Sequence, residues 1–409
     1  MLIKYEFLKI LRRRSTLIVM GVSLLIIGFL FALPTLQFRI YNQDGRLTGL
    51  EGIAWEREQQ QNLAAILTDE YIADIIREYQ RLFENPDNVG FDGNERFLIG
   101  DAYWNFQSPH RLLLTMIARN YSTVTGFGGL DILLSLDMDA DTEFYQVRSQ
   151  RIEELLNAEY RGMSDRQQEY WRTVSQRLDT PLQFGYYGGW EVIISSFELL
   201  MFAVLAICIV IAPVFAGEYQ AGTDSVILAG KYGKTKLITA KIIASFLFGL
   251  CAFMLHIFVA FGIPLMTFGT DGWDLPIQIA NPIIPYAFTF LQATLINAAV
   301  IFMVLLALIG FTLFLSSKMK TPFLVLIVVV PILFIPLFMT PTGTNGLYNL
   351  ILFLTPYRST LPQFGSYISY QFGGLVFNVL AMRAVVYGLL TIVAIPLARM
   401  GFKNHQVKA

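Results

Sequence analysis

The stretch that comes closest to a known chemical motif is residues 228–235, whose sequence is LAGKYGKT. A phosphate-binding loop follows the pattern G-x-x-x-x-G-K-[ST] and connects a β-strand to a helix, so that backbone N–H groups surround the phosphates. Here Leu228 takes the place of the first glycine, and a long apolar run precedes the segment instead of a strand. We therefore interpret the segment as a basic loop and expect no nucleotide site on this chain.

Residue types that catalyse reactions or bind metals are few and scattered. The three histidines, His110, His256 and His405, fall in segments expected in different compartments, and neither H-E-x-x-H nor G-x-S-x-G occurs. Both cysteines, Cys208 and Cys251, lie within apolar runs, which excludes a disulfide framework for the soluble part. The sequence therefore predicts no catalytic residue, no metal site and no cofactor on this chain.

The charges are unevenly distributed. Of the 409 residues, 55% are hydrophobic and 15% are charged, and the formal net charge is −1. Residues 37–191 nevertheless contain 14 arginines, no lysine and 25 acidic residues, a net charge of −11. An ordinary soluble protein has about a quarter of its residues charged, so this composition excludes a typical soluble enzyme. It predicts a membrane protein that carries one acidic soluble domain.

Six stretches are long and apolar enough to cross a bilayer, which takes about 20 residues of helix. They are residues 15–36, 192–216, 241–266, 285–315, 322–340 and 384–402, the last five within a transmembrane domain at 192–409. The predicted fold class is therefore an all-α polytopic membrane protein with six transmembrane helices. Residues 1–14 are amphipathic and are expected to form a cytoplasmic helix on the membrane surface, although they could also extend the first span.

Lysine and arginine in short loops indicate orientation, because they remain on the cytoplasmic side. With the N-terminus inside, 14 basic residues flank the spans on that side, whereas the opposite loop 267–284 has none. We therefore expect a multi-pass protein of the cell membrane with both termini cytoplasmic and residues 37–191 extracellular. Residues 37–191 are expected to fold as a mainly helical domain, with the apolar segment 111–124 at its centre. Residues 341–383 are expected to form short interfacial or re-entrant helices.

Two carboxylates lie near the ends of the second predicted span. Glu198 falls inside its outer end, where an ionisable group is costly and usually faces a partner or a cavity. It is a candidate for the substrate pathway, although its side chain could also extend to the interface beside Trp190. Glu218 ends the same span on the cytoplasmic side and begins the segment 218–236.

The segment that starts at Glu218 has the pattern of a compact helix between two spans. It consists of a glycine–threonine pair, a short apolar stretch, a turn and a basic run, in that order. The residues concerned are Gly222, Thr223, Val226, Leu228, Lys231 and Lys241. This segment resembles the coupling-helix region of ABC type 2 permeases, the membrane subunits of exporters in the ATP-binding-cassette superfamily. The large domain between the first two spans is similar to that of the sodium-efflux and antibiotic-resistance branch. It departs from the polysaccharide-export branch, whose outer loops are short.

The resemblance implies that a separate ABC ATPase subunit binds ATP and Mg and drives this chain. Two permease chains, as a homodimer or a heterodimer, would form the pore in the lipid bilayer, and no nucleic acid is expected as a partner. The coupling helix near 218–236 would bind to the ATPase. The residues expected to couple are Glu218, Gly222, Thr223, Val226, Leu228 and Lys231.

The expected function is export of an amphiphilic substrate, such as a peptide antibiotic or a lipid-like compound, or of an ion. The acidic domain could capture or release cationic amphiphiles, but a net charge of −11 also serves solubility alone. The alternative is a membrane-anchored ligand sensor or immunity protein that acts through this domain without transport. An ATPase gene beside this one favours export, whereas a histidine kinase gene alone favours sensing.

Overall fold

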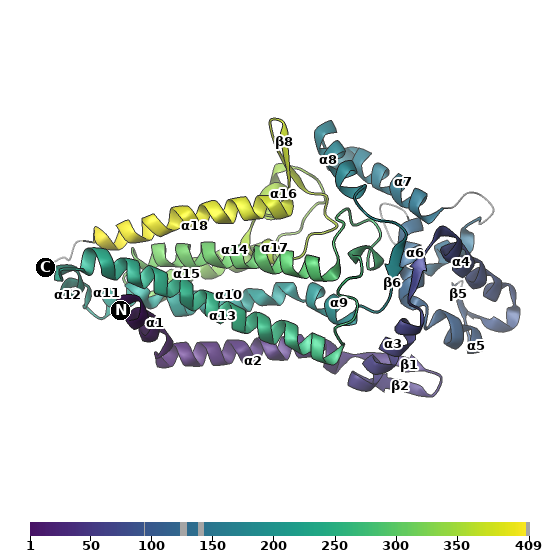
Figure 1. Cartoon of the computed structure of the whole chain (residues 1–409), viewed down its shortest axis with the longest axis horizontal. Helices are drawn as coiled ribbons and strands as arrows, with labels where there is room; N and C mark the ends of the chain where they lie inside the picture. Colours follow the sequence, from purple (N-terminus) through teal and green to yellow (C-terminus); the bar gives the residue numbers. More distant parts are fainter. Residues whose placement is uncertain (94, 123–128, 138–142, 406–409) are drawn as a thin grey trace.

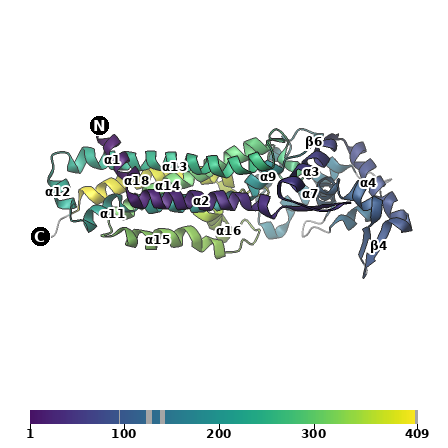
Figure 2. The ribbon, with the colours of Figure 1, turned by 90° about the horizontal axis from the view of Figure 1, so that it is seen from below.

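The computed structural model describes residues 1–93, 95–122, 129–137 and 143–405. Long apolar helices run side by side along one part of the molecule, and a more polar domain lies at one end of them (Figure 1). The opposite end carries α1 (Leu2–Leu11), the end of α18 (Val379–Lys403) and the short helix α12 (Asp224–Ala229), as Figure 2 shows from a second direction.

Five helices among the described residues are long and apolar enough to cross a membrane. The second of them is the stretch Phe197–Gln220, which contains α10 (Met201–Ile211) and α11 (Pro213–Gln220). The others are α2 (Arg14–Gln37), α13 (Ile238–Thr267, preceded by the wide helical turn η6, Gly233–Leu237), α14 (Phe290–Ser316) and α18. These helices correspond to five of the six predicted spans and agree with a helical polytopic membrane protein.

The predicted span 322–340 is shorter in the structure. The helix α15 (Pro322–Phe334) has 13 residues, and the 3-10 turn η8 (Ile335–Phe338) follows it. Pro336 lies in this turn and has no N–H group with which to continue the α-helical hydrogen bonds. A sixth full span therefore stays a prediction.

The long helices differ in how far their neighbours cover them. Of the 18 consecutive residues that are most apolar in the stretch Phe197–Gln220, 72% are buried. The corresponding share is only 22% in α2 and in α18. Leu25 and Phe29 of α2 and Leu389 of α18 are largely exposed. The second long helix is thus central, and the outer faces of α2 and α18 are apolar surfaces suited to a lipid environment.

A bend separates the first two helices. Arg13 has an extended backbone, with φ −64° and ψ 132°, between the end of α1 and the start of α2. α1 leaves the line of α2 at this residue and packs against the first turns of α13. Residues 1–14 therefore do not simply extend the first span, and the location of α1 on a membrane surface stays a prediction.

The polar domain (residues 37–191) combines helices with short pairs of strands. Its main helices are α3 (Gly49–Asn62), α4 (Asp69–Glu84), α6 (Arg111–Tyr121), α7 (Phe144–Asn157) and α8 (Asp165–Ser175). The antiparallel strand pairs are β1 (Arg39–Asn42) with β2 (Gly45–Thr48), β3 (Ala65–Leu67) with β6 (Leu182–Phe184), and β4 (Val89–Asp92) with β5 (Glu95–Leu98). The strands were not predicted, because three or four residues are too few for a recognisable alternation.

The centre of the polar domain is α6, as the apolar segment 111–124 predicts. Leu113, Leu114 and Ile117 of this helix are completely buried. Positions 123 and 124 of the predicted segment lie outside the described residues. The helix α9 (Gly188–Ser195) follows the domain and packs against α13, so the chain re-enters the bundle slightly before residue 192.

Arginines attach the polar domain to the loop between α13 and α14. The buried guanidinium of Arg148 donates hydrogen bonds to the carbonyl groups of Pro282 (2.7 Å) and Ile284 (3.2 Å). Burial lowers the pKa of Arg148, and Arg57 pairs with Asp271 at 2.6 Å. A guanidinium carries five donors in a fixed fork, whereas an ammonium is a compact point charge. Such contacts give one physical reason for a domain with arginine and no lysine.

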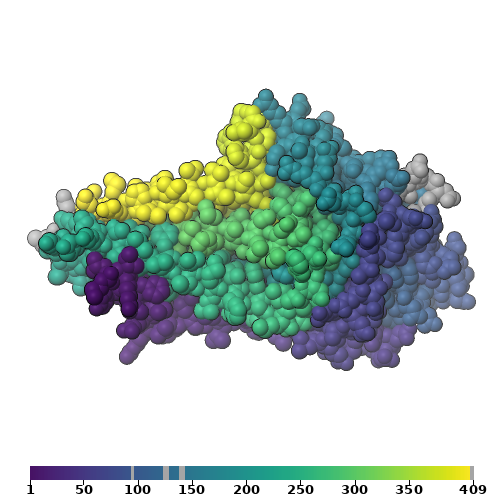
Figure 3. All heavy atoms as spheres, in the orientation of Figure 1, coloured from purple at the N-terminus to yellow at the C-terminus, as the bar shows by residue number. Residues whose placement is uncertain are grey.

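Residues 341–383 form two short helices and a hairpin. The elements are α16 (Leu347–Leu352), α17 (Pro356–Thr360), β7 (Ser369–Phe372) and β8 (Leu375–Asn378). Short helices were predicted here and are present, whereas their interfacial or re-entrant location stays a prediction, and the hairpin was not predicted. Gln167 of α8 donates hydrogen bonds to the carbonyl (3.0 Å) and the hydroxyl (3.1 Å) of Ser369, and Figure 3 shows the yellow hairpin beside the teal α8. The polar domain is therefore attached to the segment that leads directly into α18.

Candidate functional site

The helix α12 connects the second and third long helices at the end of the bundle that carries α1 (Figures 1 and 2). It follows α11 after a turn at Gly222, whose φ of +66° is a conformation that residues with a Cβ atom rarely adopt. After α12, the turn η6 leads without interruption into α13. This six-residue helix is thus connected directly to a long helix on either side.

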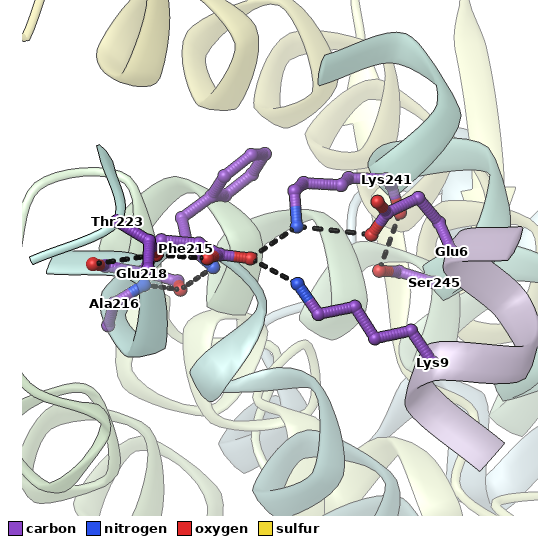
Figure 4. A network of polar contacts seen from close by, with 9 residues as sticks. Glu6, Lys9, Phe215, Ala216, Glu218, Thr223, Lys241 and Ser245 are labelled. Atoms are coloured by element: carbon purple, nitrogen blue, oxygen red, sulfur yellow. Dashed lines mark hydrogen bonds and ion pairs between the residues drawn. The ribbon is translucent and has the colours of Figure 1, made fainter. Parts of the chain in front are cut away.

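A buried carboxylate fixes the base of this connection. Glu218 is only 7% exposed, and Figure 4 shows its side chain among three donors. Its Oε1 atom accepts hydrogen bonds from the Nζ atoms of Lys241 and Lys9, both at 2.7 Å. Its Oε2 atom accepts a hydrogen bond from Oγ1 of Thr223 at 2.6 Å. Elements α1, α11, α13 and the turn before α12 therefore meet at one side chain.

The cation that faces this carboxylate is buried as well. Lys241 is 1% exposed, and its Nζ atom also lies 3.1 Å from Oε2 of Glu6. Glu6 and Lys9 are three residues apart on α1 and so lie on one face of that helix. We call these four residues, Glu6, Lys9, Glu218 and Lys241, the charged joint. It is charge-balanced, and a buried charge left without its partner would cost several kcal/mol.

A serine of α14 closes the break between α10 and α11. Pro213 has no N–H group and interrupts the helical hydrogen bonds at this point. The buried Oγ of Ser316 accepts hydrogen bonds from the N–H groups of Phe215 (3.0 Å) and Ala216 (2.9 Å), and it donates one to the carbonyl of Ala212 (2.6 Å). These hydrogen bonds give partners to backbone N–H and carbonyl groups at the junction, and they fix α11 to α14.

Contacts from the end of α18 hold α12 on another side. The buried Asp224 lies at the start of α12, and its Oδ2 atom is 3.4 Å from Nε2 of His405. The ring of His405 also lies 4.3 Å from that of Tyr219 in α11. The helix α12 is therefore held between η6 and the residues that follow α18.

The predicted coupling residues divide into a buried and an exposed group. Glu218 and Leu228 are buried, and the partners of Glu218 lie within this chain. The exposed group consists of Gly222, Thr223, Val226 and Lys231, and Val226 is 75% exposed. The first group positions α12, and the second forms its outward surface. Binding of an ATPase to that surface stays a prediction.

Lys241 belongs to this site, although the sequence pattern indicated only that it ends the basic run and did not predict a coupling role for it. It is the one charged residue of α13, within 30 otherwise uncharged positions. An ionisable group in an apolar helix needs a partner, so this isolation is the signal that could have identified it. Its partners Glu6 and Glu218 are far away in sequence and become adjacent only when α1 crosses α13.

The segment 228–235 lacks the geometry of a phosphate-binding loop. It covers the end of α12 and the first part of η6, so it joins two helices and follows no strand. The lysine side chains Lys231 and Lys236 lie over the ring of Tyr232, at 5.6 Å and 4.8 Å from its centre. This arrangement agrees with the interpretation of the segment as a basic loop.

Glu198 lies at the opposite end of the second long helix. It is half-buried in the 3-10 turn η5 (Phe197–Leu200), and the hydroxyl of Tyr357 in α17 donates a hydrogen bond to its Oε2 atom at 2.9 Å. The contact connects this helix to the segment 341–383 and shows how a carboxylate is accommodated there. A role of Glu198 in a substrate pathway stays a prediction.

One comparison with known proteins gives a match. The family model described as "ABC-2 family transporter protein" matches residues 1–399. The match includes α1, α12, the polar domain, the first four long helices and most of α18. No curated protein and no solved structure matches the chain.

Proposed function

Because this chain belongs to the ABC-2 family of transporter proteins, we propose that it is the permease subunit of an ABC exporter that a separate ATPase subunit drives. Membership of the family and five long apolar helices make the chain a membrane-embedded permease of an ABC transporter. ATP and Mg would bind to the ATPase subunit. The contribution of this chain would be a pathway through the membrane and a surface that receives the movement of the ATPase.

The main support for the proposal is that α12 has an exposed face and lies next to the buried charged joint. A six-residue helix is unstable alone in water, so the contacts of Glu218, Asp224 and Leu228 keep α12 folded. These contacts leave Val226 projecting outward as an apolar side chain that a groove on the ATPase would enclose. Closure of the ATPase would then move α12, and the charged joint would pass that movement to α1, α11 and α13.

We place this end of the bundle in the cytoplasm. Thirteen of the 14 basic residues that flank the predicted spans on the N-terminal side are among the described residues and lie at this end, whereas the domain at the other end has a net charge of −11. Basic residues in short loops remain cytoplasmic, so this distribution supports an extracellular location of the polar domain. A second permease chain, identical or related, would complete the pathway.

The cargo that fits this arrangement is an amphiphilic molecule, such as a peptide antibiotic or a lipid-like compound, or an ion. An acidic domain attracts cationic molecules to the outer end of the pathway. Glu198, which lies below that domain with Tyr357 as its partner, adds a carboxylate near the outer end of the second long helix. These two features support a cationic or partly cationic cargo.

Co-purification with a candidate ABC ATPase tests the proposal, together with the substitution Gly222→Pro. Proline cannot adopt the φ of +66° that the turn before α12 requires. We expect ATP turnover of the complex in proteoliposomes to fall by about tenfold or more, equivalent to about 1.4 kcal/mol of lost coupling.

The matched control is Gly343→Pro. Gly343 also has a positive φ, +76°, with open space around it, but it lies at the other end of the bundle. We expect this variant to keep nearly full turnover. Unchanged turnover in Gly222→Pro, with the complex intact, would contradict a coupling role for α12.

A further inference from the structure

A pocket with a basic rim lies beside the charged joint, between α1, η6 and the end of α18. Its volume is about 580 Å³, and its walls include Tyr232, Thr235, Lys236 and Arg399. Lys236 and Arg399 are both exposed, and none of the described residues that line the pocket is acidic. The pocket therefore offers two cations and several hydroxyl groups in one place.

The two cations have no carboxylate of their own in the part of the chain that the structure describes. Three acidic residues lie at this end of the bundle, and each is paired elsewhere. Glu6 and Glu218 contact Lys241, and Asp224 contacts His405. Lys236 lies over the ring of Tyr232, which leaves its charge uncompensated. The rim of the pocket is thus complementary to an anion.

An apolar groove of about 410 Å³ continues from this pocket along the bundle. Thr239 and Arg399 line both hollows, so the two are adjacent. The rest of the groove is lined by apolar side chains of α13, α14 and α18, among them Leu247, Phe302 and Ile395. Leu247 is partly exposed, so the groove opens on the lipid-facing side of the bundle.

We propose that the pocket and the groove together bind one anionic phospholipid. Its phosphate lies between Arg399 and Lys236, near the hydroxyl groups of Thr235 and Thr239, and one acyl chain follows the groove past Leu247. Basic pockets between transmembrane helices at the cytoplasmic side suit anionic lipid headgroups, and arginine binds phosphate through two parallel hydrogen bonds. A free phosphate ion would satisfy the rim and leave the apolar groove unused.

The proposed lipid lies beside elements that adjoin the proposed coupling helix α12 and the charged joint. It contacts η6, which follows α12, together with α1 and α18. Its binding depends on the membrane location of the chain and is independent of the cargo, of the direction of transport and of ATPase docking. Failure of the lipid site would therefore leave the proposed function untouched, and the reverse also holds.

Native mass spectrometry of the full chain, titrated with dioleoyl-phosphatidylglycerol and separately with dioleoyl-phosphatidylcholine, tests the proposal. We expect the first anionic lipid to bind at least about fivefold more tightly than the zwitterionic one. The variants Arg399→Gln and Lys236→Gln should each lower the affinity for phosphatidylglycerol by about fivefold, which corresponds to about 1 kcal/mol per basic residue. Lys320→Gln removes an exposed lysine at the same end that lines neither hollow, and it should keep the preference.

A second variant tests the groove separately from the charge. Leu247→Trp fills the groove from its lipid-facing side. We expect it to lower the affinity for phosphatidylglycerol although the charged rim is intact. Inorganic phosphate, added in excess, should fail to displace the lipid. Equal binding of the two lipids, unchanged binding in the Arg399→Gln/Lys236→Gln double variant, or complete displacement by inorganic phosphate would each overturn the proposal.

Discussion

Replacement of Glu218 by glutamine is expected to lower the free energy of unfolding by about 3–5 kcal/mol, the usual cost of removing one member of a buried ion pair. Glutamine has nearly the same shape, so the loss comes from the charge and not from a cavity. Lys241 is 1% exposed and would keep only Glu6 as its anion. Chemical denaturation in detergent micelles, followed by circular dichroism, measures this change.

Two further variants separate the charge effect from general damage. Lys9 also contacts Glu218, but its side chain is 46% exposed, so Lys9→Gln should cost only about 0–1 kcal/mol. In the triple variant Glu6→Gln/Glu218→Gln/Lys241→Met, the buried cation and both of its carboxylates are replaced, so most of the lost stability should return. If Glu218→Gln were as mild as Lys9→Gln, the charged joint would not be what holds α1, α11 and α13 together.

Replacement of Val226 by aspartate is expected to prevent binding of the ATPase while the chain stays folded. Val226 is 75% exposed, and substitutions at such positions change stability by only about 0.5 kcal/mol. Within a complex, the new carboxylate would be enclosed without a partner at a cost of about 2 kcal/mol or more, which is about 30-fold in affinity. Surface plasmon resonance with the chain in nanodiscs measures that affinity.

The matched control for this variant lies at the other end of the molecule. Ile66 of β3 is also an exposed apolar residue, and Ile66→Asp introduces the same charge in the polar domain. We expect this control to bind the ATPase as tightly as the unmodified chain. Equal affinity in Val226→Asp would place the docking surface away from α12.

Hydropathy predicted the long helices well, because each of these signals lies within one continuous stretch of sequence. The ends were less accurate where a local break interrupts an apolar run. The second span was predicted at 192–216, whereas the structure has α9 up to Ser195 and a separate long helix from Phe197. Ser196, whose φ of −102° and ψ of 5° are not helical, separates them, and hydropathy carries no information about such a break.

The sequence predicted a short helix within the segment 218–236, and α12 lies there, but which of its residues are buried could not be predicted. Glu218 and Val226 both belong to it, yet one is buried among lysines and the other projects outward. This difference arises because α1 crosses α13 and brings Glu6 and Lys9 to the carboxylate. Contacts between residues more than 200 positions apart leave no local pattern in the sequence.

The helix α13 offers a direct connection between the coupling site and the polar domain. Its 30 residues, at about 1.5 Å each, give an unbroken rod of roughly 45 Å. Lys241 in the charged joint lies near its first turn, and the loop after its last turn contains Asp271, which pairs with Arg57 of the polar domain. Displacement of α12 would thus reach the polar domain through a single helix.

Photocrosslinking from position 226 shows whether α12 lies against the ATPase. The photoreactive residue p-benzoylphenylalanine would replace Val226 in the full chain, co-expressed with a candidate ABC ATPase. The same residue would replace Ile66 in a parallel sample. We expect a crosslinked product with the ATPase from position 226 and none from position 66. An intact complex that crosslinks from position 66, or that gives no product from position 226, would contradict it.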